Sequence, residues 1–378
     1  MKKNVLQFIG SFHQGGSERQ TLQLAKLLKT DETYNVSLGV LTDEGVLRKE
    51  AEAMGFSEIH AFPLNSFYDL NFVKQMRKCV RFLRDNKIEV VHTHDFYTNV
   101  FGITAARLAK VKVKIASKRE TGGIRSRKQD VVEKRIFAIA DAIVANSYDV
   151  KNYVIGKGTS AAKIEVIYNG LDLERLEPKQ KDHAEICEEL KLPKDENIKF
   201  ITLVANLRHT TKNQQMFLRV ARKIMKKMPQ VHFVLAGEGE LKEGMENLAR
   251  EFGIDEKTHF LGRCTKVPEL LSVSYIGALS SRYEGFSNSI LEYMAARLPV
   301  VATIVAGSSE SILEGETGYL VEPDDDELME NRLIELLENE EKARQFGEKG
   351  RARVEEHFSV GAQLRNILEL YERKLNGE

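Results

Sequence analysis

The chain has 378 residues, 42% of them hydrophobic and 30% charged, which is typical of a globular protein with about two domains. No run reaches the roughly eighteen apolar residues that a membrane span needs, and Gln7 interrupts the N-terminal apolar segment, so we expect a first strand rather than a signal peptide and a cytoplasmic protein. The three cysteines are scattered and form no Cys-x-x-Cys or Cys/His cluster, which argues against a disulfide framework or a zinc site.

The net charge of zero hides an asymmetry between the two halves of the chain. Residues 1–170 contain 27 Lys and Arg against 18 Asp and Glu, and the excess is concentrated in residues 107–135. Two interpretations stay open: a solvated basic face, or attraction to an anionic substrate or surface such as the inner face of the cell membrane. No helix-turn-helix, zinc-finger or aromatic-studded sheet pattern accompanies the charge, so nucleic acid is not an expected partner.

Short apolar runs alternate with longer amphipathic runs along the whole chain. The strands that these runs predict lie at residues 4–10, 35–41, 88–94, 111–117, 142–147, 164–170, 198–206, 231–237, 258–262, 276–281, 299–303 and 318–322. Alternation of strands and helices predicts parallel sheets that are covered by helices on both faces. We therefore expect an α/β fold of two Rossmann-like, doubly wound domains that face each other across a ligand-binding cleft.

The boundary between the two domains is expected near residue 175. The chain becomes polar there, contains Pro178, and shows no strong periodicity again until Ile198. This gives an N-terminal domain over 1–175 and a C-terminal domain over 176–357. The last segment, 358–378, is predicted to be an amphipathic helix whose apolar face consists of Leu364, Ile367, Leu368 and Tyr371.

Two glutamates, Glu284 and Glu292, flank a strand–turn–helix segment in the C-terminal domain. Ser287 is the candidate N-cap of that helix, because its hydroxyl can accept from a free backbone N–H of the first turn. Eight helical residues would separate them by about 12 Å, which is more than the roughly 5–9 Å between two carboxylates that flank one glycosidic bond. A nucleotide sugar fits the spacing better. Backbone N–H groups near Ser287 and Asn288 would hold its phosphates, while Glu292 would accept from the ribose and Glu284 from the sugar. The plain alternative is one exposed helix glutamate and one loop charge.

The run SRYEGFSNSILEYMA, residues 281–295, resembles the signature of the retaining glycosyltransferases of the GT-B type, specifically the large family 4. The usual pattern there is small-x-x-Glu-Gly-Phe, then a small residue or Pro, then Leu-Glu-Ala-Met-Ala. Further segments resemble the family in the same order and cover almost the whole chain: residues 10–28, 90–108, 142–147, 163–172, 209–221, 237–275 and 298–325.

The resemblance implies a role for each matching residue of the glutamate motif. Glu292 would bind the ribose of the donor. Glu284, with the backbone of Gly285 and Phe286, would face the donor sugar. Glu310 matches a family glutamate in a loop that borders the donor pocket, although the residues around it depart from the usual Gly-Gly-x-Pro-Glu.

The resemblance also implies that Arg208 and Lys212 neutralise the diphosphate as it leaves. Fixed cations can stabilise this developing charge without a metal. Asn206 occupies the position of the usual family arginine, and the loop to Lys212 is one residue longer, so Arg208 is expected to substitute. Surface cations of a loop are the alternative.

In the first domain, His92 and His94 alternate along a strand and therefore point to one face. The family places a histidine here beside the donor sugar and acceptor, and His94 is favoured because it is nearer the strand end; a packed histidine is the alternative. Gly16, preceded by Gly15, would let the backbone approach a bound diphosphate closely, unless this is a plain strand–helix turn.

The resemblance implies a retaining, metal-independent glycosyltransferase with a nucleoside-diphosphate-sugar donor, UDP-sugar first and GDP-sugar second. The C-terminal domain would hold the donor, the N-terminal domain would present the acceptor, and the last helix would cross back to the N-terminal domain. The acceptor would be a saccharide or a lipid-linked saccharide of cell-surface polysaccharide or glycolipid synthesis. The basic segment 107–135 additionally suggests peripheral contact with an anionic membrane. No metal or other cofactor is expected, because residues 324–326 resemble a helix N-cap cluster more than a metal-binding Asp-x-Asp motif. The alternatives are a nucleotide-sugar 2-epimerase or a phosphorylase on the same fold, and a non-catalytic sugar-binding protein.

Overall fold

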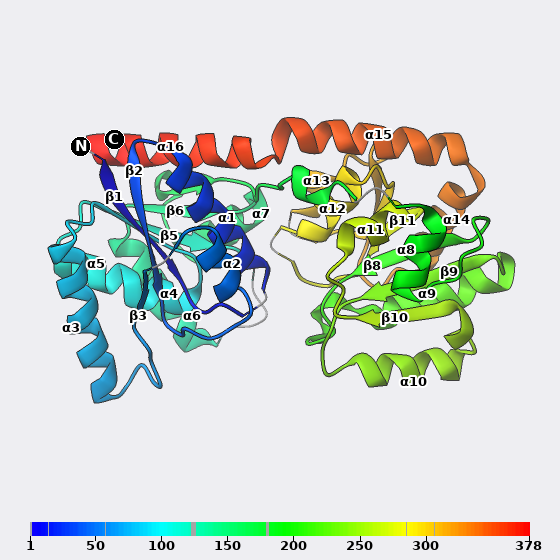
Figure 1. The fold of residues 1–378 in the computed structure, drawn as a ribbon, viewed down its shortest axis with the longest axis horizontal. Helices are drawn as coiled ribbons and strands as arrows, with labels where there is room; N and C mark the ends of the chain where they lie inside the picture. Colours follow the sequence, from blue (N-terminus) through cyan, green and yellow to red (C-terminus); the bar gives the residue numbers. More distant parts are fainter. Residues whose placement is uncertain are drawn as a thin grey trace. The chain divides into compact units, whose positions relative to one another are not determined.

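The computed structural model describes residues 2–13, 15–56, 58–121, 126–178, 181–284, 286–305 and 307–378. The chain forms two compact units, each with its own sheet (Figure 1). The first unit comprises the residues up to Gly170 together with Val360–Glu378, and the second comprises Leu171–Ser359. The division after Gly170 lies five residues before the boundary drawn from the sequence at residue 175.

The described residues of the first unit contain a seven-stranded parallel sheet in the order β3-β2-β1-β4-β5-β6-β7. Its strands are β1 Lys3–Ile9, β2 Tyr34–Val40, β3 Ile59–Ala61, β4 Val90–Thr93, β5 Val113–Lys118, β6 Ala142–Ala145 and β7 Ile164–Val166. Its helices are α1 Gly16–Thr30, α2 Arg48–Ala53, α3 Leu70–Asp85, α4 Phe96–Thr98, α5 Thr104–Ala109, α6 Arg127–Ile139, α7 Tyr148–Gly156 and α16 Val360–Asn376, with short helical turns η1 Asn99–Ile103 and η2 Ala161–Lys163.

The described residues of the second unit contain a six-stranded parallel sheet in the order β10-β9-β8-β11-β12-β13. Its strands are β8 Lys199–Val204, β9 Val231–Ala236, β10 Thr258–Gly262, β11 Ile276–Leu279, β12 Val300–Thr303 and β13 Gly318–Val321. Its helices are α8 His183–Leu190, α9 Gln214–Lys227, α10 Lys242–Phe252, α11 Val267–Ser272, α12 Asn288–Ala295, α13 Ser308–Ser311, α14 Asp326–Glu338 and α15 Glu340–His357, with short helical turns η3 Glu174–Leu176, η4 Thr210–Lys212 and η5 Asp255–Lys257.

Alternate residues of β1 and β8 belong to different core clusters, because successive side chains of a strand point to opposite faces of a sheet. In β1, Val5 and Ile9 pack with α1 and α16, whereas Leu6 and Phe8 pack with α3 and α5. In β8, Ile201 and Leu203 pack with α9 and α14, whereas Phe200 packs with α8 and α11. Each sheet is therefore covered on both faces, and the predicted pair of doubly wound, Rossmann-like domains is confirmed.

All twelve strands expected from the sequence are present, with ends shifted by a few residues. The additional strand, β3, was not predicted because it has only three residues, Ile59–Ala61, and contains a histidine at its centre. Among the described residues, no helix combines the length and the apolar composition that crossing a membrane would require.

The C-terminal helix α16 packs on the first unit. Its residues Ile367, Leu370, Tyr371 and Leu375 are buried against residues of β1, β2 and α1, and Leu364 and Leu368 lie against the same cluster. The apolar face expected from the sequence is thus the face that contacts the sheet.

Candidate functional site

The strand order of the second unit marks one place where a ligand site is favoured. From β8 the chain continues to β9 on one side, while β11 lies on its other side, so the connections leave in opposite directions. In open α/β sheets, ligands bind beyond the carboxyl ends of strands at such a switch point. The segments that follow β8 and β11 contain Lys212 and Glu284, two of the residues selected from the sequence.

Lys212 and Glu284 form an ion pair, although 72 residues separate them in the chain. The two serines that follow β11 hold the pair in place. The Ser281 hydroxyl donates to Oε1 of Glu284 at 2.9 Å, and the Ser280 hydroxyl lies 3.0 Å from the carbonyl oxygens of Lys212 and Asn213. Ser281 is the small residue that opens the glutamate motif, but its bond to Glu284 was not predicted. Ser280 was not singled out, because a small polar residue after a strand carries no signal of its own.

Arg208 forms a second ion pair in the same region, with Glu238 after β9, at an N–O distance of 2.7 Å. The two loops lie in direct backbone contact. A Cβ atom at Gly237 would lie 2.0 Å from the carbonyl oxygen of Ala205, and one at Gly239, whose φ is +155°, would lie 2.1 Å from the carbonyl carbon of Leu207. Only glycine fits these positions, so the Gly-x-Gly sequence sets how closely the Arg208 loop approaches the next loop.

Asn206, the residue at the position of the usual family arginine, is exposed, and its carbonyl oxygen accepts from the Gln214 side chain at 2.9 Å. The structure therefore brings Arg208 and Lys212 to one loop, between β8 and α9, and leaves the Asn206 side chain in solvent.

Helix α12 begins at Asn288, and Ser287 is its N-cap residue as expected. The expectation that the Ser287 hydroxyl accepts from the first turn is wrong: the side chain is buried and makes no capping hydrogen bond. The first turn is thus not capped by its own N-cap side chain, and helix N-termini of this kind attract anions.

Phe286 is buried, and its ring packs on Phe358 with a centroid distance of 5.4 Å. Its side chain therefore anchors the loop, and only its backbone is in a position to meet a ligand. Gly285 lies outside the described residues.

Glu292 lies in the second turn of α12 and is half-buried. The next residue, Tyr293, is fully buried, and its hydroxyl accepts from the backbone N–H of Val204 at 2.6 Å at the end of β8. Burial, and to a lesser degree the charges of Glu292 and Glu284, raise the pKa of Tyr293. Tyr293 and Ser289, whose hydroxyl donates to the carbonyl oxygen of Val204 at 2.7 Å, fix α12 to the end of β8.

Glu310 is half-buried on the short helix α13, and its carbonyl oxygen accepts from Arg353 at 2.7 Å. Of residues 324–326, Asp325 caps α14 through Leu328 N–H at 2.9 Å, as expected for an N-cap cluster. Asp324 instead accepts two hydrogen bonds of 2.8 Å from Arg282, which hold the pKa of its carboxyl at about 2. The described residues contain no group of three or more His, Cys, Asp and Glu arranged to hold a metal ion.

In the first unit, the corresponding switch point lies between β1 and β4. His94 follows β4 directly and is buried, with Nδ1 3.2 Å from Arg119 and Nε2 2.7 Å from Gln7 Oε1. His92 is also buried on the same face, 4.2 Å from the ring of His94, and packs against Tyr371. Gln7, Arg119 and Tyr371 were not selected from the sequence, although a glutamine within a buried strand must find partners.

The donors and acceptors of this cluster allow only one consistent direction. Arg119 can only donate, so His94 Nδ1 accepts and its Nε2–H donates to Gln7. The Gln7 amide then donates to the Tyr371 hydroxyl at 2.7 Å, which donates to His92 Nδ1 at 2.8 Å, whose Nε2–H donates to Ser117 at 2.9 Å. Both histidines are neutral in this chain, and burial lowers the pKa of each.

Gly16 is the first residue of α1 and is exposed, and Gly15 is the N-cap residue. A Cβ atom at Gly15 would lie 2.2 Å from the Glu18 carboxylate. The absence of a side chain at Gly15 therefore makes room for the side chain of Glu18. Burial raises the pKa of Glu18.

The basic segment 107–135 is not a uniform charged face. Lys118 is buried and paired with Glu133 at 3.0 Å, and Lys114 is buried and paired with Asp141 at 2.6 Å. Arg119 belongs to the His94 cluster. Several cations of this segment are therefore neutralised within the unit, and part of the segment lies outside the described residues.

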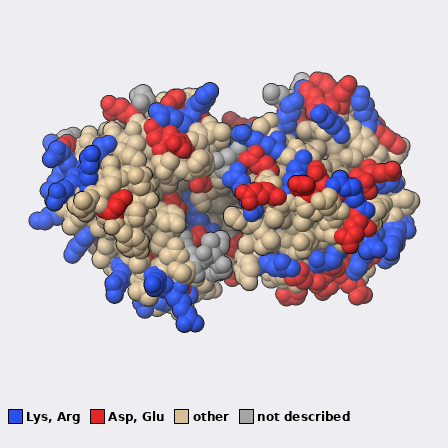
Figure 2. Space-filling model, turned by 90° about the horizontal axis from the view of Figure 1, so that it is seen from below, with Lys and Arg blue, Asp and Glu red and all other residues tan. Residues whose placement is uncertain are grey.

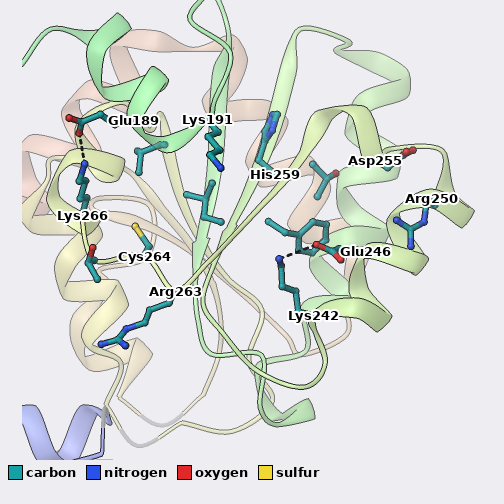
Figure 3. Close-up of a pocket in the computed structure, with 15 residues that line it drawn as sticks. Glu189, Lys191, Lys242, Glu246, Arg250, Asp255, His259, Arg263, Cys264 and Lys266 are labelled. Atoms are coloured by element: carbon teal, nitrogen blue, oxygen red, sulfur yellow. Dashed lines mark hydrogen bonds and ion pairs between the residues drawn. The ribbon is translucent and has the colours of Figure 1, made fainter. Parts of the chain in front are cut away.

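A groove of about 770 Å³ follows the edge strand β10 of the second unit, between the end of α8 and α10. Figure 3 shows two ion pairs on its opposite sides, Glu189–Lys266 at 2.6 Å and Lys242–Glu246 at 3.3 Å. None of the residues selected from the sequence lines this groove, so it is separate from the Lys212–Glu284 site.

Two family models match the chain, one in each unit. Residues 14–175 match "Glycosyltransferase Family 4", and residues 187–353 match "Glycosyl transferases group 1". Together they account for most of the chain.

Curated relatives agree with the family models. The chain is 28% identical over 244 residues to EpsD of Bacillus subtilis (strain 168), which is 64% of this chain and 62% of that protein. It is 25% identical over 338 residues to the UDP-Gal:alpha-D-GlcNAc-diphosphoundecaprenol alpha-1,3-galactosyltransferase of Escherichia coli, which covers 86% of this chain and 85% of that enzyme. The match to EpsD thus spans less than two thirds of the relative.

Among solved structures, HepE of Anabaena in complex with UDP-glucose superposes with a TM-score of 0.86, covering 98% of this chain and 99% of that one at 21% identity. At this identity the likeness establishes the fold. Taken with the two family models, it shows that the chain belongs to the GT-B glycosyltransferases.

Proposed function

We propose that the protein is a nucleoside-diphosphate-sugar-dependent glycosyltransferase that binds its donor on the second unit. The observation that carries this proposal is the convergence of Lys212, Glu284 and the first turn of α12 at the β8–β11 switch point. A cation, a carboxylate and a helix N-terminus that its own N-cap side chain leaves open match the phosphates and hydroxyls of such a donor.

In this proposal the diphosphate lies at the first turn of α12 and accepts hydrogen bonds from Lys212 and Arg208. Cleavage of the sugar–phosphate bond leaves negative charge on the phosphate, and fixed cations stabilise that charge. Both cations are paired with carboxylates here, Glu284 and Glu238, so a bound diphosphate would replace a carboxylate partner of each. No metal is required in this scheme, because the cations supply the positive charge.

The two motif glutamates are proposed to hold the sugars on either side of the diphosphate. Glu292 would accept from the ribose, and Glu284 and Glu310 would border the donor sugar, together with the backbone around Phe286 and Asn288. Support comes from their position: Glu284 follows β11, the neighbour of β8, and Glu292 lies on α12, which Tyr293 fixes to the end of β8.

UDP is proposed as the first nucleotide to test and GDP as the second, because HepE is solved with UDP-glucose and the E. coli relative is named for a UDP-galactose donor. The acceptor is proposed to be a saccharide of polysaccharide or glycolipid synthesis. It would be linked to a lipid through a diphosphate, as is the acceptor in the name of the E. coli relative. We propose transfer with retention of the anomeric configuration, as the resemblance to family 4 implies. NMR of the anomeric proton of the product would decide this.

The first unit is proposed to bind the acceptor. Both ring nitrogens of His94 already have partners, so we propose that it acts by orienting Arg119 rather than by touching substrate itself. Gly16 stays a prediction as a close-approach position near the diphosphate.

Isothermal titration calorimetry with UDP, GDP and ADP tests the donor site. Lys212→Ala is expected to weaken the binding of the preferred diphosphate about ten-fold or more, because a charge-assisted hydrogen bond is lost. Lys242→Ala is the matched control, since Lys242 is also an ion-paired lysine of the second unit but lies on the β10 groove. Absence of binding by all three nucleotides, or equal effects of both variants, would overturn the proposal.

A transfer assay separates the remaining alternatives. A glycosyltransferase releases nucleoside diphosphate in proportion to glycosylated acceptor. A 2-epimerase converts one nucleotide sugar into another and releases no free nucleoside diphosphate. A sugar-binding protein releases no nucleoside diphosphate with any acceptor. No feature of the described residues favours either alternative.

A further inference from the structure

Helix α3 of the first unit has one face that packs on the unit and one that does not. Met76, Cys79 and Leu83 recur every three or four residues and are buried against β1, β4 and α5. The opposite face and the residue before the N-cap form what we call the α3 surface. It consists of Tyr68, Leu70, Val73, Lys74, Arg77, Lys78, Arg81 and Arg84.

The start of this surface is apolar and almost fully exposed. Tyr68 is 98% exposed, Leu70 88% and Val73 44%. Asp69, between the first two, caps the helix by accepting from Phe72 N–H at 2.8 Å, so the helix begins firmly at this point. The folded unit gains nothing from a tyrosine and a leucine that are exposed to water on either side of the N-cap residue, which indicates that something else covers them.

The rest of the surface is cationic. Positions 74, 77, 81 and 84 follow each other at spacings of three and four residues and form a single stripe in line with Leu70, and Lys78 lies beside it. Within the described part of the chain, none of the five cations forms an ion pair. Lys78 and Arg84 donate instead to the carbonyl oxygens of Ala61 and Leu108, at 2.9 and 2.7 Å.

Two cations of the basic segment selected from the sequence differ from those of α3, all five of which are exposed. Lys118 and Lys114 are buried and neutralised by carboxylates of the same unit. Figure 2 shows one face of the molecule on which blue side chains predominate over the first unit, whereas both colours are mixed over the second. The cations of α3 retain their full attraction for an external anion.

We propose that the α3 surface is a membrane-contact site that binds the headgroups of anionic phospholipids with its cationic stripe and inserts Tyr68, Leu70 and Val73 into the interfacial layer. Tyrosine is favoured at the membrane interface, and long Lys and Arg side chains reach headgroups while their stems cover apolar surface. A nucleic acid could bind to the cations, but it would leave Leu70 and Val73 in water, because aliphatic side chains offer no stacking surface for bases.

Flotation with lipid vesicles tests the proposal and needs neither donor nor acceptor, so its result does not depend on the proposed function. The full-length chain is mixed with vesicles of phosphatidylcholine alone, or with phosphatidylglycerol added to a third of the lipid. Each basic residue near an anionic surface contributes about a five-fold factor in partitioning. Lys74→Glu with Arg77→Glu is therefore expected to lower binding to anionic vesicles at least twenty-five-fold.

The matched control reverses two exposed cations of the same unit, Arg127→Glu with Lys128→Glu, on α6 in the basic segment. It is expected to lower binding far less. A second variant, Tyr68→Ser with Leu70→Ser, is expected to lower the vesicle binding that persists at 0.5 M salt. At that concentration, screening removes most of the electrostatic attraction between the cations and the lipid headgroups. All changed side chains are exposed, and an unchanged melting temperature verifies folding.

Three results would overturn the proposal. The first is equal binding to neutral and anionic vesicles. The second is equal loss in the α3 and α6 variants. The third is binding to duplex DNA or RNA that the α3 reversal abolishes while vesicle binding persists, which would assign the surface to an acidic polymer instead.

Discussion

The Nε2 atom of His94 lies 2.7 Å from Oε1 of Gln7, and this contact begins a buried hydrogen-bond chain that runs through Gln7 to Tyr371 on the C-terminal helix. Gln7 is on the face of β1 that α16 covers, which is why a residue 364 positions away is its partner. The helix at the end of the chain therefore fixes the orientation of the Gln7 amide, and together with Arg119 it keeps the proton of His94 on Nε2.

Removing the Tyr371 hydroxyl is expected to disturb this arrangement. In Tyr371→Phe the Gln7 amide loses its acceptor and is free to rotate, so Arg119 alone then favours the Nε2–H form of His94. Nitrogen-15 NMR of the imidazole should show a modest fall in the fraction of the Nε2–H tautomer of His94. Transfer, once an acceptor is known, should show a lower kcat with little change in the KM for the donor.

Tyr34→Phe is the control for that variant. Tyr34 is buried beside Tyr371, with ring centroids 5.9 Å apart, and its hydroxyl has no hydrogen-bond partner in the described residues. It is therefore expected to leave the His94 tautomer unchanged. A tautomer that shifts equally in both variants would mean that packing, and not the hydrogen-bond chain, sets it.

Stability is expected to fall as the pH drops from 7 to 5. Burial lowers the pKa of His92 to about 3 and that of His94 well below its usual value, so the unfolded chain takes up protons below about 6.5 that the folded chain does not. The free energy of unfolding then decreases by roughly 1.4 kcal/mol per pH unit for each histidine below that pH. Burial raises the pKa of Glu18 and Asp95, which acts in the opposite direction nearer pH 4.

Urea unfolding at a series of pH values measures this slope. Burial also lowers the pKa of His92 and of the half-buried His60, His232 and His259, so His94→Gln isolates the contribution of one histidine. The slope of this variant between pH 6 and 5 should be shallower than that of the unaltered chain by roughly 1.4 kcal/mol per pH unit. His209→Gln is the control, since His209 is exposed. A slope that the His94 variant leaves unchanged would show that His94 is protonated in the folded state.

The fold was open to prediction from the sequence because buried parallel strands are nearly continuous apolar runs, and twelve of these stand out. The sequence also indicated that Lys212 and Glu284 lie near each other, because both follow strands whose carboxyl ends meet at one sheet edge. The partners of Gln7 could not, because a hydrogen bond to Tyr371 depends on where α16 packs and leaves no local pattern. The absent Ser287 cap was mispredicted for a related reason: a capping bond depends on the turn before the helix.

Gly277→Ala is expected to destabilise the second unit. A Cβ atom there would lie 2.3 Å from the ring of Tyr293, whose hydroxyl is fixed to Val204, so the ring cannot retreat without losing that bond. Overpacking of this kind costs about 1–3 kcal/mol, and a lower melting temperature should accompany weaker nucleotide binding. Gly244→Ala is the control, because Gly244 lies within helix α10 with nothing near its missing Cβ, and alanine there should stabilise by up to about 1 kcal/mol.

The pairing of Lys212 with Glu284 predicts opposite effects on binding and on transfer. In Glu284→Gln the lysine loses its carboxylate partner, so a diphosphate no longer competes with an internal anion. UDP, or whichever diphosphate the calorimetry identifies, should bind about five-fold more tightly, which corresponds to ~1 kcal/mol for a partly exposed ion pair. Transfer should become slower, because the proposed carboxylate contact to the donor sugar is lost. Glu238→Gln, which releases Arg208 in the same way, should tighten binding without the same loss of transfer. Weaker diphosphate binding in Glu284→Gln would mean that Glu284 supports the site by positioning Lys212 and does not compete for it.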